Sequence, residues 1–246
     1  MANLRIKGLG GMDEVGASSV QVEFPDIDRN LLLDSGIRMI NERGPHGELT
    51  RRTRGHIPPD VRIDAALITH GHSDHHGDLP RQWPRILDTS PNAKVFMTKP
   101  TFYIAGNLWL NTSYLMANKK IKVDLDYEAN FAKGVRMIVE QAKNDLIEKP
   151  GWVEIFPGVE AYFGPNGHIR GSAFIVLRIN GKTQIMFSGD MSVYDSPTVK
   201  GMKIPEEFIG KLDAIFVEST YGDRVLIPRA EEDERIAALA KDTINR

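Results

Sequence analysis

Short runs of hydrophobic residues, separated by turn-forming residues, dominate the first hundred residues of the chain. Glycine, proline, aspartate and asparagine lie between the runs, and this punctuation is typical of strands joined by turns. The pattern predicts strands at residues 4–7, 18–24, 31–33, 63–69 and 94–98. The opening part of the chain is therefore expected to be rich in β-structure.

Two longer segments and a second group of short runs follow. The segment 102–116 is mostly hydrophobic and long enough for a buried helix, and 127–148 has hydrophobic residues near helical spacing before Pro150 and Gly151. Further strands are predicted at 153–156, 159–163, 173–179, 184–187 and 214–217, and a last helix at 229–246. Two β-rich parts, each with helices, predict two sheets packed together with helices outside.

Composition and charge narrow the class of protein. With 41% hydrophobic and 26% charged residues, the 246-residue chain is typical of a globular protein. The net charge of −2 excludes a global positive field, so a polyanion has to be held locally. The absence of cysteine excludes disulfides, thiolate zinc fingers and a cysteine nucleophile. No signal peptide or membrane span is recognisable, which predicts a cytoplasmic enzyme without a membrane partner.

A cluster of histidines directly follows the predicted strand 63–69. His70 and His72 are two positions apart, so from an extended backbone their rings point the same way and can hold one metal ion. Asp74 and His75 lie beyond the turn, where they can hold a second ion, and paired ions are a known device of hydrolases. The cluster has too many ligands for one closed structural zinc site. His76 is expected to be a neighbour of the site, not a ligand.

Further candidate ligands follow strand-like runs elsewhere. His168 and Asp190 each follow a glycine in the second β-rich part. Alone, such residues are more often turn or capping residues, but the first cluster favours the ligand interpretation of both. Asp34 follows the run 31–33 and is predicted to accept the second N–H of a ligand histidine and fix its tautomer. An ordinary turn aspartate is the alternative.

The order of these residues resembles the metallo-β-lactamase superfamily. Its hallmark is a strand-end aspartate, then H-x-H-x-D-H, then Gly-His, then Gly-Asp. The resemblance implies an αββα sandwich, with the metal ions at one edge of two mixed sheets. It also implies that Asp190 bridges the two ions. The other implied ligands are His70, His72 and His168 for the first ion, and Asp74 and His75 for the second.

Three segments narrow the resemblance to the β-CASP nucleases. GGMDEVGAS at 10–18 is similar to their opening hairpin, and GHIRGSA at 167–173 to their third motif. FVESTYGDR at 216–224 is similar to their E-S-T-Y-G segment, which leads into the β-CASP domain, and is the most specific match. The resemblance implies that Glu218 is the acidic residue that, in relatives, pairs with a later histidine to assist proton transfer to the leaving group. An ion-paired strand-end residue is the alternative.

The function that the resemblance implies is metal-dependent hydrolysis of phosphodiesters in RNA processing, either endonucleolytically or from the 5′ end. Its catalytic residues would be Asp74, Asp190 and Glu218. Two divalent ions, with zinc preferred over manganese or iron, would supply an activated hydroxide. Single-stranded RNA is the expected partner, with DNA as the second choice, and a homo-oligomer is left open.

The resemblance also predicts the domain organisation. Residues 1–222 are expected to form the N-terminal part of a metallo-β-lactamase domain, and residues 223–246 the start of a β-CASP domain. Relatives return to the sandwich with a further ligand histidine, whereas no histidine follows His168 here. We therefore expect the N-terminal portion of a longer nuclease, lacking the C-terminal completion of the sandwich, which leaves the activity of these residues alone open.

Substrate contacts and two alternative functions complete the predictions. Arg51, Arg52 and Arg54 cluster before His56 in a predicted loop, where they can bind phosphates without base specificity; a solvated surface is the commoner explanation. A hydrolase of small esters, thioesters or lactams would need a complete site within these residues. A noncatalytic nucleic-acid-binding or assembly subunit is disfavoured by the full set of ligands up to Asp190.

Overall fold

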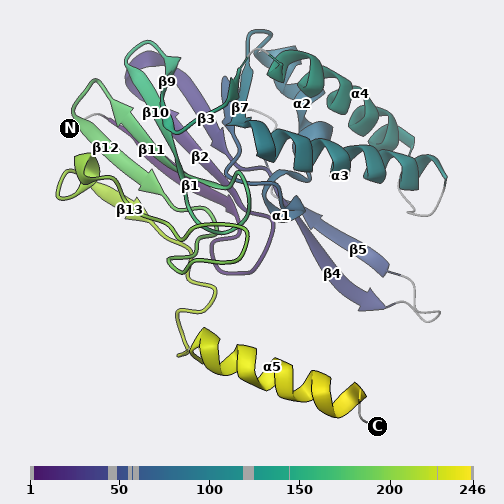
Figure 1. Cartoon of the computed structure of the whole chain (residues 1–246). Helices are drawn as coiled ribbons and strands as arrows, with labels where there is room; N and C mark the ends of the chain where they lie inside the picture. The colour runs from purple at the N-terminus through teal and green to yellow at the C-terminus, as the bar shows by residue number, and fades with distance from the viewer. Residues whose placement is uncertain are drawn as a thin grey trace.

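Two mixed β-sheets face each other in the computed structural model of the chain (Figure 1). The structure describes the backbone of residues 3–43, 49–54, 57, 61–118, 125–143, 145–225 and 227–244. It describes the side chains of the same residues except 39–43, 49–54, 125–126 and 229. The predicted α/β class with two mixed sheets flanked by helices is confirmed.

The first sheet has six strands in the order β1-β2-β3-β6-β7-β8. The strands β1, β2 and β3 pair antiparallel, whereas β3, β6, β7 and β8 run parallel. Their bounds are Arg5–Gly10 (β1), Ser19–Phe24 (β2), Arg29–Leu33 (β3), Ala65–Leu67 (β6), Lys94–Thr98 (β7) and Leu146–Ile147 (β8).

The second sheet has five strands in the order β13-β12-β11-β10-β9. The strand β13 runs parallel to β12, and the other neighbours are antiparallel. The bounds are Gly151–Phe156 (β9), Val159–Pro165 (β10), Ala173–Ile179 (β11), Thr183–Phe187 (β12) and Ala214–Phe216 (β13). A separate antiparallel pair consists of β4 (Ile37–Arg43) and β5 (Leu49–Arg54).

Three helices cover the outer face of the first sheet (Figure 1). They are α2 (Leu79–Thr89), α3 (Lys99–Ala117) and α4 (Leu125–Ala142). The remaining helices are α1 (Ser73–His76), α5 (Arg229–Ile244) and the short 3-10 turns η1 (Pro25–Ile27) and η2 (Glu206–Phe208). Among the described residues, no helix combines the length and the hydrophobicity needed to cross a membrane.

Alternation along the strands divides the buried residues into layers. Leu31 and Leu33 of β3 face the second sheet, whereas Leu32 faces the helices, where Trp83 and Phe131 are also buried. Such continuous hydrophobic runs are typical of parallel strands with both faces covered. On the outer face of the second sheet, η2 contributes Phe208, which packs on Phe174 and Val176 of β11.

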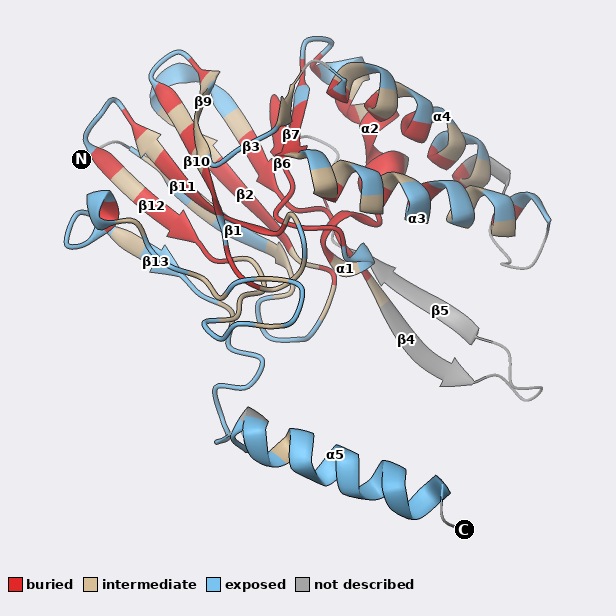
Figure 2. Ribbon diagram, viewed as in Figure 1, coloured by how far each residue is buried: buried red, intermediate tan, exposed pale blue. Residues whose placement is uncertain are grey.

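The helix α5 lies apart from both sheets, and its described side chains are mostly exposed (Figure 2). Its hydrophobic residues Ile236, Leu239 and Ile244 are 62%, 67% and 83% exposed. The sequence predicted this helix over 229–246; it ends at Ile244, and the last two residues lie outside the described part of the chain.

Two local predictions were wrong. The helix predicted to extend to residue 148 ends at Ala142, because Leu146 and Ile147 pair with the end of β7 as a strand. The arginines at 51, 52 and 54 were predicted in a loop, but their backbone belongs to β5.

The helix α2 was not predicted because a proline interrupts its pattern. Pro84 lies inside it and has no N–H for the carbonyl of Pro80. Gly134 of α4 packs against that carbonyl so closely that a Cβ would overlap it. Tertiary packing therefore stabilises a helix that local propensity disfavours.

Candidate metal centre

The carboxyl ends of several strands meet at one edge of the sandwich. Asp34 follows β3, His70 and His72 follow β6, and Asp190 and Glu218 follow β12 and β13. The pairs β3 and β6, and β12 and β13, run parallel, so within each pair the strands end at the same edge. The chain therefore brings polar side chains from both sheets to one place.

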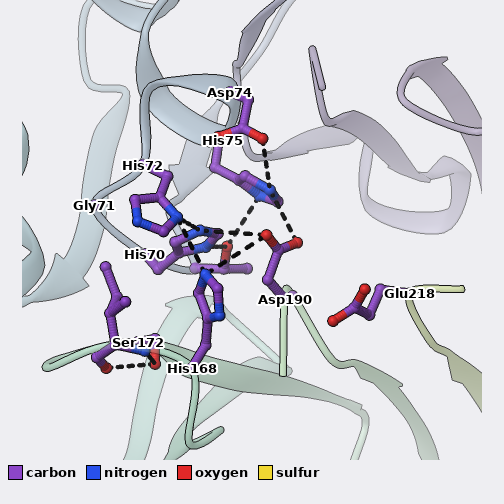
Figure 3. Close-up of polar contacts among 12 residues, drawn as sticks. His70, Gly71, His72, Asp74, His75, His168, Ser172, Asp190 and Glu218 are labelled. Atoms are coloured by element: carbon purple, nitrogen blue, oxygen red, sulfur yellow. Dashed lines mark hydrogen bonds and ion pairs between the residues drawn. The ribbon is translucent and has the colours of Figure 1, made fainter. Parts of the chain in front are cut away.

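The first group of candidate ligands contains three histidines whose ring nitrogens converge (Figure 3). The Nδ1 atom of His72 lies 3.1 Å from Nε2 of His70 and 3.1 Å from Nε2 of His168. The Oδ2 atom of Asp190 lies 3.7 Å from both of these Nε2 atoms. His168 comes from the loop between β10 and β11, in the other sheet from His70.

The second group consists of Asp74, His75 and the same Asp190. The Nε2 atom of His75 lies 3.1 Å from Asp190 Oδ1 and 3.9 Å from Asp74 Oδ2. Asp190 thus directs one oxygen to each group. The structure brings together all six predicted ligands, although their role as ligands stays a prediction.

Asp34 lies behind His75 and is almost completely buried. Its Oδ2 atom is 2.7 Å from His75 Nδ1, and its Oδ1 atom accepts the backbone N–H of Thr69 at 2.8 Å. A carboxylate at this place receives a hydrogen from Nδ1 and leaves Nε2 free to bind an ion. Asp34 has a left-handed backbone with φ of 60°, which aspartate tolerates better than most residues.

The ring environments set different protonation states in the metal-free protein. Burial, reinforced by the charge of His75, lowers the pKa of His70 to about 2, and burial also lowers the pKa of His168. Burial would lower the pKa of His75 too, but the carboxylates of Asp34 and Asp190 outweigh it and raise this pKa to about 10. His70 and His168 are therefore neutral and ready to bind an ion, whereas His75 has to release a proton first.

The donor set fits divalent metal ions. With a metal–nitrogen distance of about 2.0–2.1 Å, two nitrogens on one tetrahedral ion lie about 3.3 Å apart, close to the 3.1 Å separations among the three rings. A neutral imidazole has only one N–H, so its other nitrogen carries a lone pair. Three lone pairs that converge on one point are stabilised better by a shared cation than by hydrogen bonds among the rings. The His and Asp side chains at this edge thus form two groups that could each hold a metal ion.

A cavity of about 550 Å³ opens beside the second group. It is lined by residues 11–16 of the β1–β2 turn, by Asp74, His75 and Asp190, and by 216–220 at the end of β13. The first group's histidines do not line it. A substrate in this cavity would therefore reach the centre from the side of Asp74 and His75.

Glu218 lines the same cavity and contacts the loop that carries Asp190. Its Oε1 atom accepts the backbone N–H of Met191 at 2.9 Å. In Figure 3, Glu218 lies on the far side of Asp190 from the three histidines. The side chain is placed beside the cluster as predicted, and its part in proton transfer stays a prediction.

His76 is fully buried and points away from the cluster of ligands. Its Nε2 atom lies 3.0 Å from the carbonyl of Gly71, and its ring packs edge-on against Trp109. Burial lowers the pKa of His76 to about 4, so it is neutral and donates from Nε2. The expectation that it is a neighbour agrees with this geometry. The side chains of Arg51, Arg52 and Arg54 lie outside the described residues.

Two buried polar residues at the centre were missed. Thr69 lies between Asp34 and His70, and Asn166 joins two ligand loops by donating to Ser188 O at 2.9 Å and accepting from His168 N at 3.3 Å. A hydroxyl directly before the first histidine of the cluster could have indicated Thr69. Asn166 has no comparable sequence signal.

Comparison with known proteins finds relatives along nearly the whole chain. The transcription termination factor FttA of Pyrococcus horikoshii is 28% identical over 252 residues, which cover 99% of this chain and 36% of the relative. Endoribonuclease YSH1 of Yarrowia lipolytica is 27% identical and covers 97% of this chain and 26% of the relative. Cleavage and polyadenylation specificity factor 73 of Drosophila melanogaster is 27% identical, with 99% and 32% covered.

The chain thus spans between a quarter and somewhat over a third of the length of these relatives. No family model matches it. Among solved structures, the metallo-β-lactamase fold protein YhfI from Bacillus subtilis aligns with a TM-score of 0.43 at 13% identity, over 80% of this chain and 65% of that one. The sequence relatives confirm the predicted resemblance to the β-CASP branch of the superfamily.

Proposed function

We propose that this chain, a relative of the β-CASP nucleases of the metallo-β-lactamase superfamily, is the metal-binding part of a nuclease that hydrolyses phosphodiesters in RNA. The carboxylate of Asp190 carries the proposal: its Oδ2 faces the first ligand group and its Oδ1 the second. One carboxylate with an oxygen directed to each group suits a centre that holds two neighbouring ions, an arrangement that hydrolases use. The names of the relatives, which include an endoribonuclease and a cleavage factor, favour RNA as the substrate.

Two divalent ions are proposed, with His70, His72 and His168 on one, Asp74 and His75 on the other, and Asp190 on both. Zinc suits this set of nitrogens and carboxylates, and manganese or iron could replace it. When bound, a pair of such ions lowers the pKa of a shared water and neutralises charge on the scissile phosphate. The rest of the reaction depends on the side chains around them.

The residues of the chain position the substrate and the leaving group. Besides the proposed ligands and Asp34, the charged residues that line the cavity are the acidic Asp13, Glu14, Glu218 and Asp223 and the basic Arg224. Because acidic side chains predominate, bound cations would reduce the repulsion of a phosphodiester. Glu218 has one oxygen held by Met191 N–H. We propose that its other oxygen assists the transfer of a proton to the leaving oxygen of the substrate. Arg51, Arg52 and Arg54 remain proposed contacts to phosphates.

The proposed domain division places the boundary at residues 222 and 223. The two sheets and their helices lie before it, and α5, which stands apart from them, lies after it (Figure 1). We propose that 1–222 form the metal-binding domain and that 223–246 belong to a β-CASP domain. Single-stranded RNA is the proposed partner, cleaved either internally or from the 5′ end.

The test uses the protein expressed from its complete reading frame and loaded with zinc or manganese. End-labelled RNA, DNA of the same sequence and a nitrophenyl ester are offered in parallel. We expect cleavage of RNA that Asp190→Ala abolishes and that Lys182→Ala, an exposed change in the β11–β12 turn, leaves unchanged. Activity confined to the ester would refute the nuclease proposal, and RNA binding without cleavage would favour the noncatalytic subunit.

A further inference from the structure

A buried hydroxyl connects the two groups of candidate ligands. The Oγ1 atom of Thr69 lies 2.8 Å from Asp34 Oδ2 and 3.1 Å from His70 Nδ1. The same Asp34 oxygen lies 2.7 Å from His75 Nδ1. One carboxylate oxygen therefore reaches a histidine of each group, directly for His75 and through a hydroxyl for His70.

The direction of these hydrogen bonds follows from the chemistry of the groups. A carboxylate only accepts, and a hydroxyl has a single hydrogen. Since Thr69 donates that hydrogen to Asp34, its oxygen can only accept from His70, so Nδ1 of His70 carries the ring hydrogen. The Nε2 atom of His70 then keeps its lone pair, and it is Nε2 that converges with the nitrogens of the first group.

His75 is oriented without the hydroxyl. Its Nδ1 lies 3.4 Å from Thr69 Oγ1 but only 2.7 Å from Asp34 Oδ2, so its hydrogen goes to the carboxylate. Its Nε2 faces Asp190 Oδ1. Removal of the Thr69 hydroxyl would thus release His70 while leaving the bond between His75 and Asp34 in place.

Thr69 is itself held rigidly between the two sheets. Its backbone N–H donates to Asp34 Oδ1 at 2.8 Å, and its carbonyl accepts the N–H of Ala173, at the start of β11, at 2.9 Å. Gly189, which precedes Asp190 and has φ of +55°, lies so close that a Cβ there would be 3.0 Å from Thr69 Cβ. The side chain is completely buried, so its hydroxyl has a fixed position from which to orient His70.

We propose that Thr69 is a positioning residue for the metal ion bound by His70, His72 and His168. Its hydroxyl holds the His70 ring with the hydrogen on Nδ1 and directs Nε2 to the ion. The inference rests on the proposed metal site and divides the roles within it. Asp34 supports a ligand in each group, whereas Thr69 supports the first group alone.

The experiment compares Thr69→Val, which keeps the shape but removes the hydroxyl, with Thr69→Ser, which keeps the hydroxyl. Zinc affinity is measured by equilibrium dialysis against a competing chelator, with folding checked by circular dichroism. We expect T69V to weaken the binding of one of the two ions by about 10–100-fold. T69S should bind both ions with an affinity within about 3-fold of that of wild type. Asp34→Asn is expected to weaken the binding of both ions.

Three results would overturn the proposal. They are wild-type affinity for both ions in T69V, an equal loss of affinity for both ions in T69V, and a loss of affinity in T69S as large as that in T69V. Ring-nitrogen NMR of the metal-free wild-type protein is a second measurement that does not depend on a variant's folding. It should place the His70 hydrogen on Nδ1, and a hydrogen on Nε2 would refute the assignment. A wild-type chain that binds no ion would instead refute the metal site, while the NMR result would still decide the hydrogen bond.

Discussion

The Oε1 atom of Glu218 lies 2.9 Å from the backbone nitrogen of Met191, the residue that follows Asp190. A glutamate predicted for proton transfer therefore also holds a ligand loop in place. The two roles can be separated, because an amide oxygen can accept the Met191 N–H as well as a carboxylate can, but an amide cannot ionise.

Replacement of Glu218 by glutamine should lower kcat by about 10²- to 10⁴-fold, since general acid–base catalysis contributes on this scale. The metal content should stay unchanged, because glutamine keeps the contact with Met191. Glu218→Ala should lower both kcat and the metal content. Single-turnover cleavage of RNA and metal analysis of the same samples test this, and an E218Q variant with wild-type kcat would exclude the catalytic role.

Ligand variants should remove the ions selectively. His168→Ala should lose the ion of the first group, Asp74→Ala that of the second, and Asp190→Ala both, because Asp190 directs an oxygen to each group. Even the loss of a residue that only supports a ligand typically lowers metal affinity by about 10- to 100-fold. A site weakened by this much or more should therefore lose its ion on dialysis. Equal loss of both ions in H168A and D74A would contradict two distinguishable sites.

Metal binding should release a proton from His75 at pH 8. The pKa of this ring is raised to about 10 in the metal-free protein, so the ring is charged at pH 8 and must deprotonate to bind an ion. Titration calorimetry in buffers of different ionisation enthalpy should show about one proton more released by wild type than by His75→Ala. Equal proton release from both proteins would argue against a charged His75.

The same shift fixes the sign of a stability change in the metal-free protein. The folded-state pKa of His75 lies above the unfolded value of 6.5, so its contribution to stability is complete below pH 6.5 and is lost as the pH rises towards 10. Urea unfolding with chelator present should show this loss in wild type but not in His75→Gln. A wild type that gains stability relative to H75Q over this range would reverse the sign.

His76 should act in the opposite direction in acid. Burial lowers its pKa to about 4, so its contribution is complete above pH 6.5 and is lost as the pH falls towards 4. The shift corresponds to about 3 kcal/mol of unfolding free energy at most. Comparison of wild type with His76→Gln by chemical denaturation at pH 7 and pH 4.5 isolates the contribution of His76 to this pH dependence. Parallel changes in the two proteins would show that the pKa of His76 is the same in the folded and unfolded states.

Trypsin should release α5 without affecting the metal centre. Arg224 is exposed, and so are most of the described side chains that follow it in α5. We expect a product ending at Arg224 that binds as many ions as the whole chain and has a melting temperature within a few degrees of it, about what a change below 1 kcal/mol produces. Loss of the ions on cleavage would show that the proposed boundary at 222 divides one folding unit.

Most of the candidate ligands that the structure brings together could be predicted because they lie close together in the sequence. His70, His72, Asp74 and His75 lie within six consecutive positions after a strand, and this one segment brings most of the candidate donors together. The hydrogen bond from Thr69 to Asp34 joins residues 35 apart, and its direction depends on which atoms face each other across the sheet. Such relationships leave no trace in periodicity or spacing.

The fold shows the same limit. The strands β7 and β11 were predicted with the observed bounds, since each is a continuous hydrophobic run. The strand β8 has only two residues, too few to show an alternating hydrophobic pattern, and is defined by its pairing with β7. Residues 79–89 carry an amphipathic helical pattern, but Pro84 argues against a helix there, and the packing of α2 depends on Gly134, which lies in another helix.

The division of the ligands between the sheets has a mechanical consequence. His70, His72, Asp74 and His75 follow strands of the first sheet, whereas His168 and Asp190 follow strands of the second. An ion in either group would tie distant parts of the chain together and reduce the freedom of the unfolded state, as a disulfide does. In a chain without cysteine, the metal ions would serve as a reversible clasp between the two halves of the sandwich, one that a chelator opens and a metal salt closes.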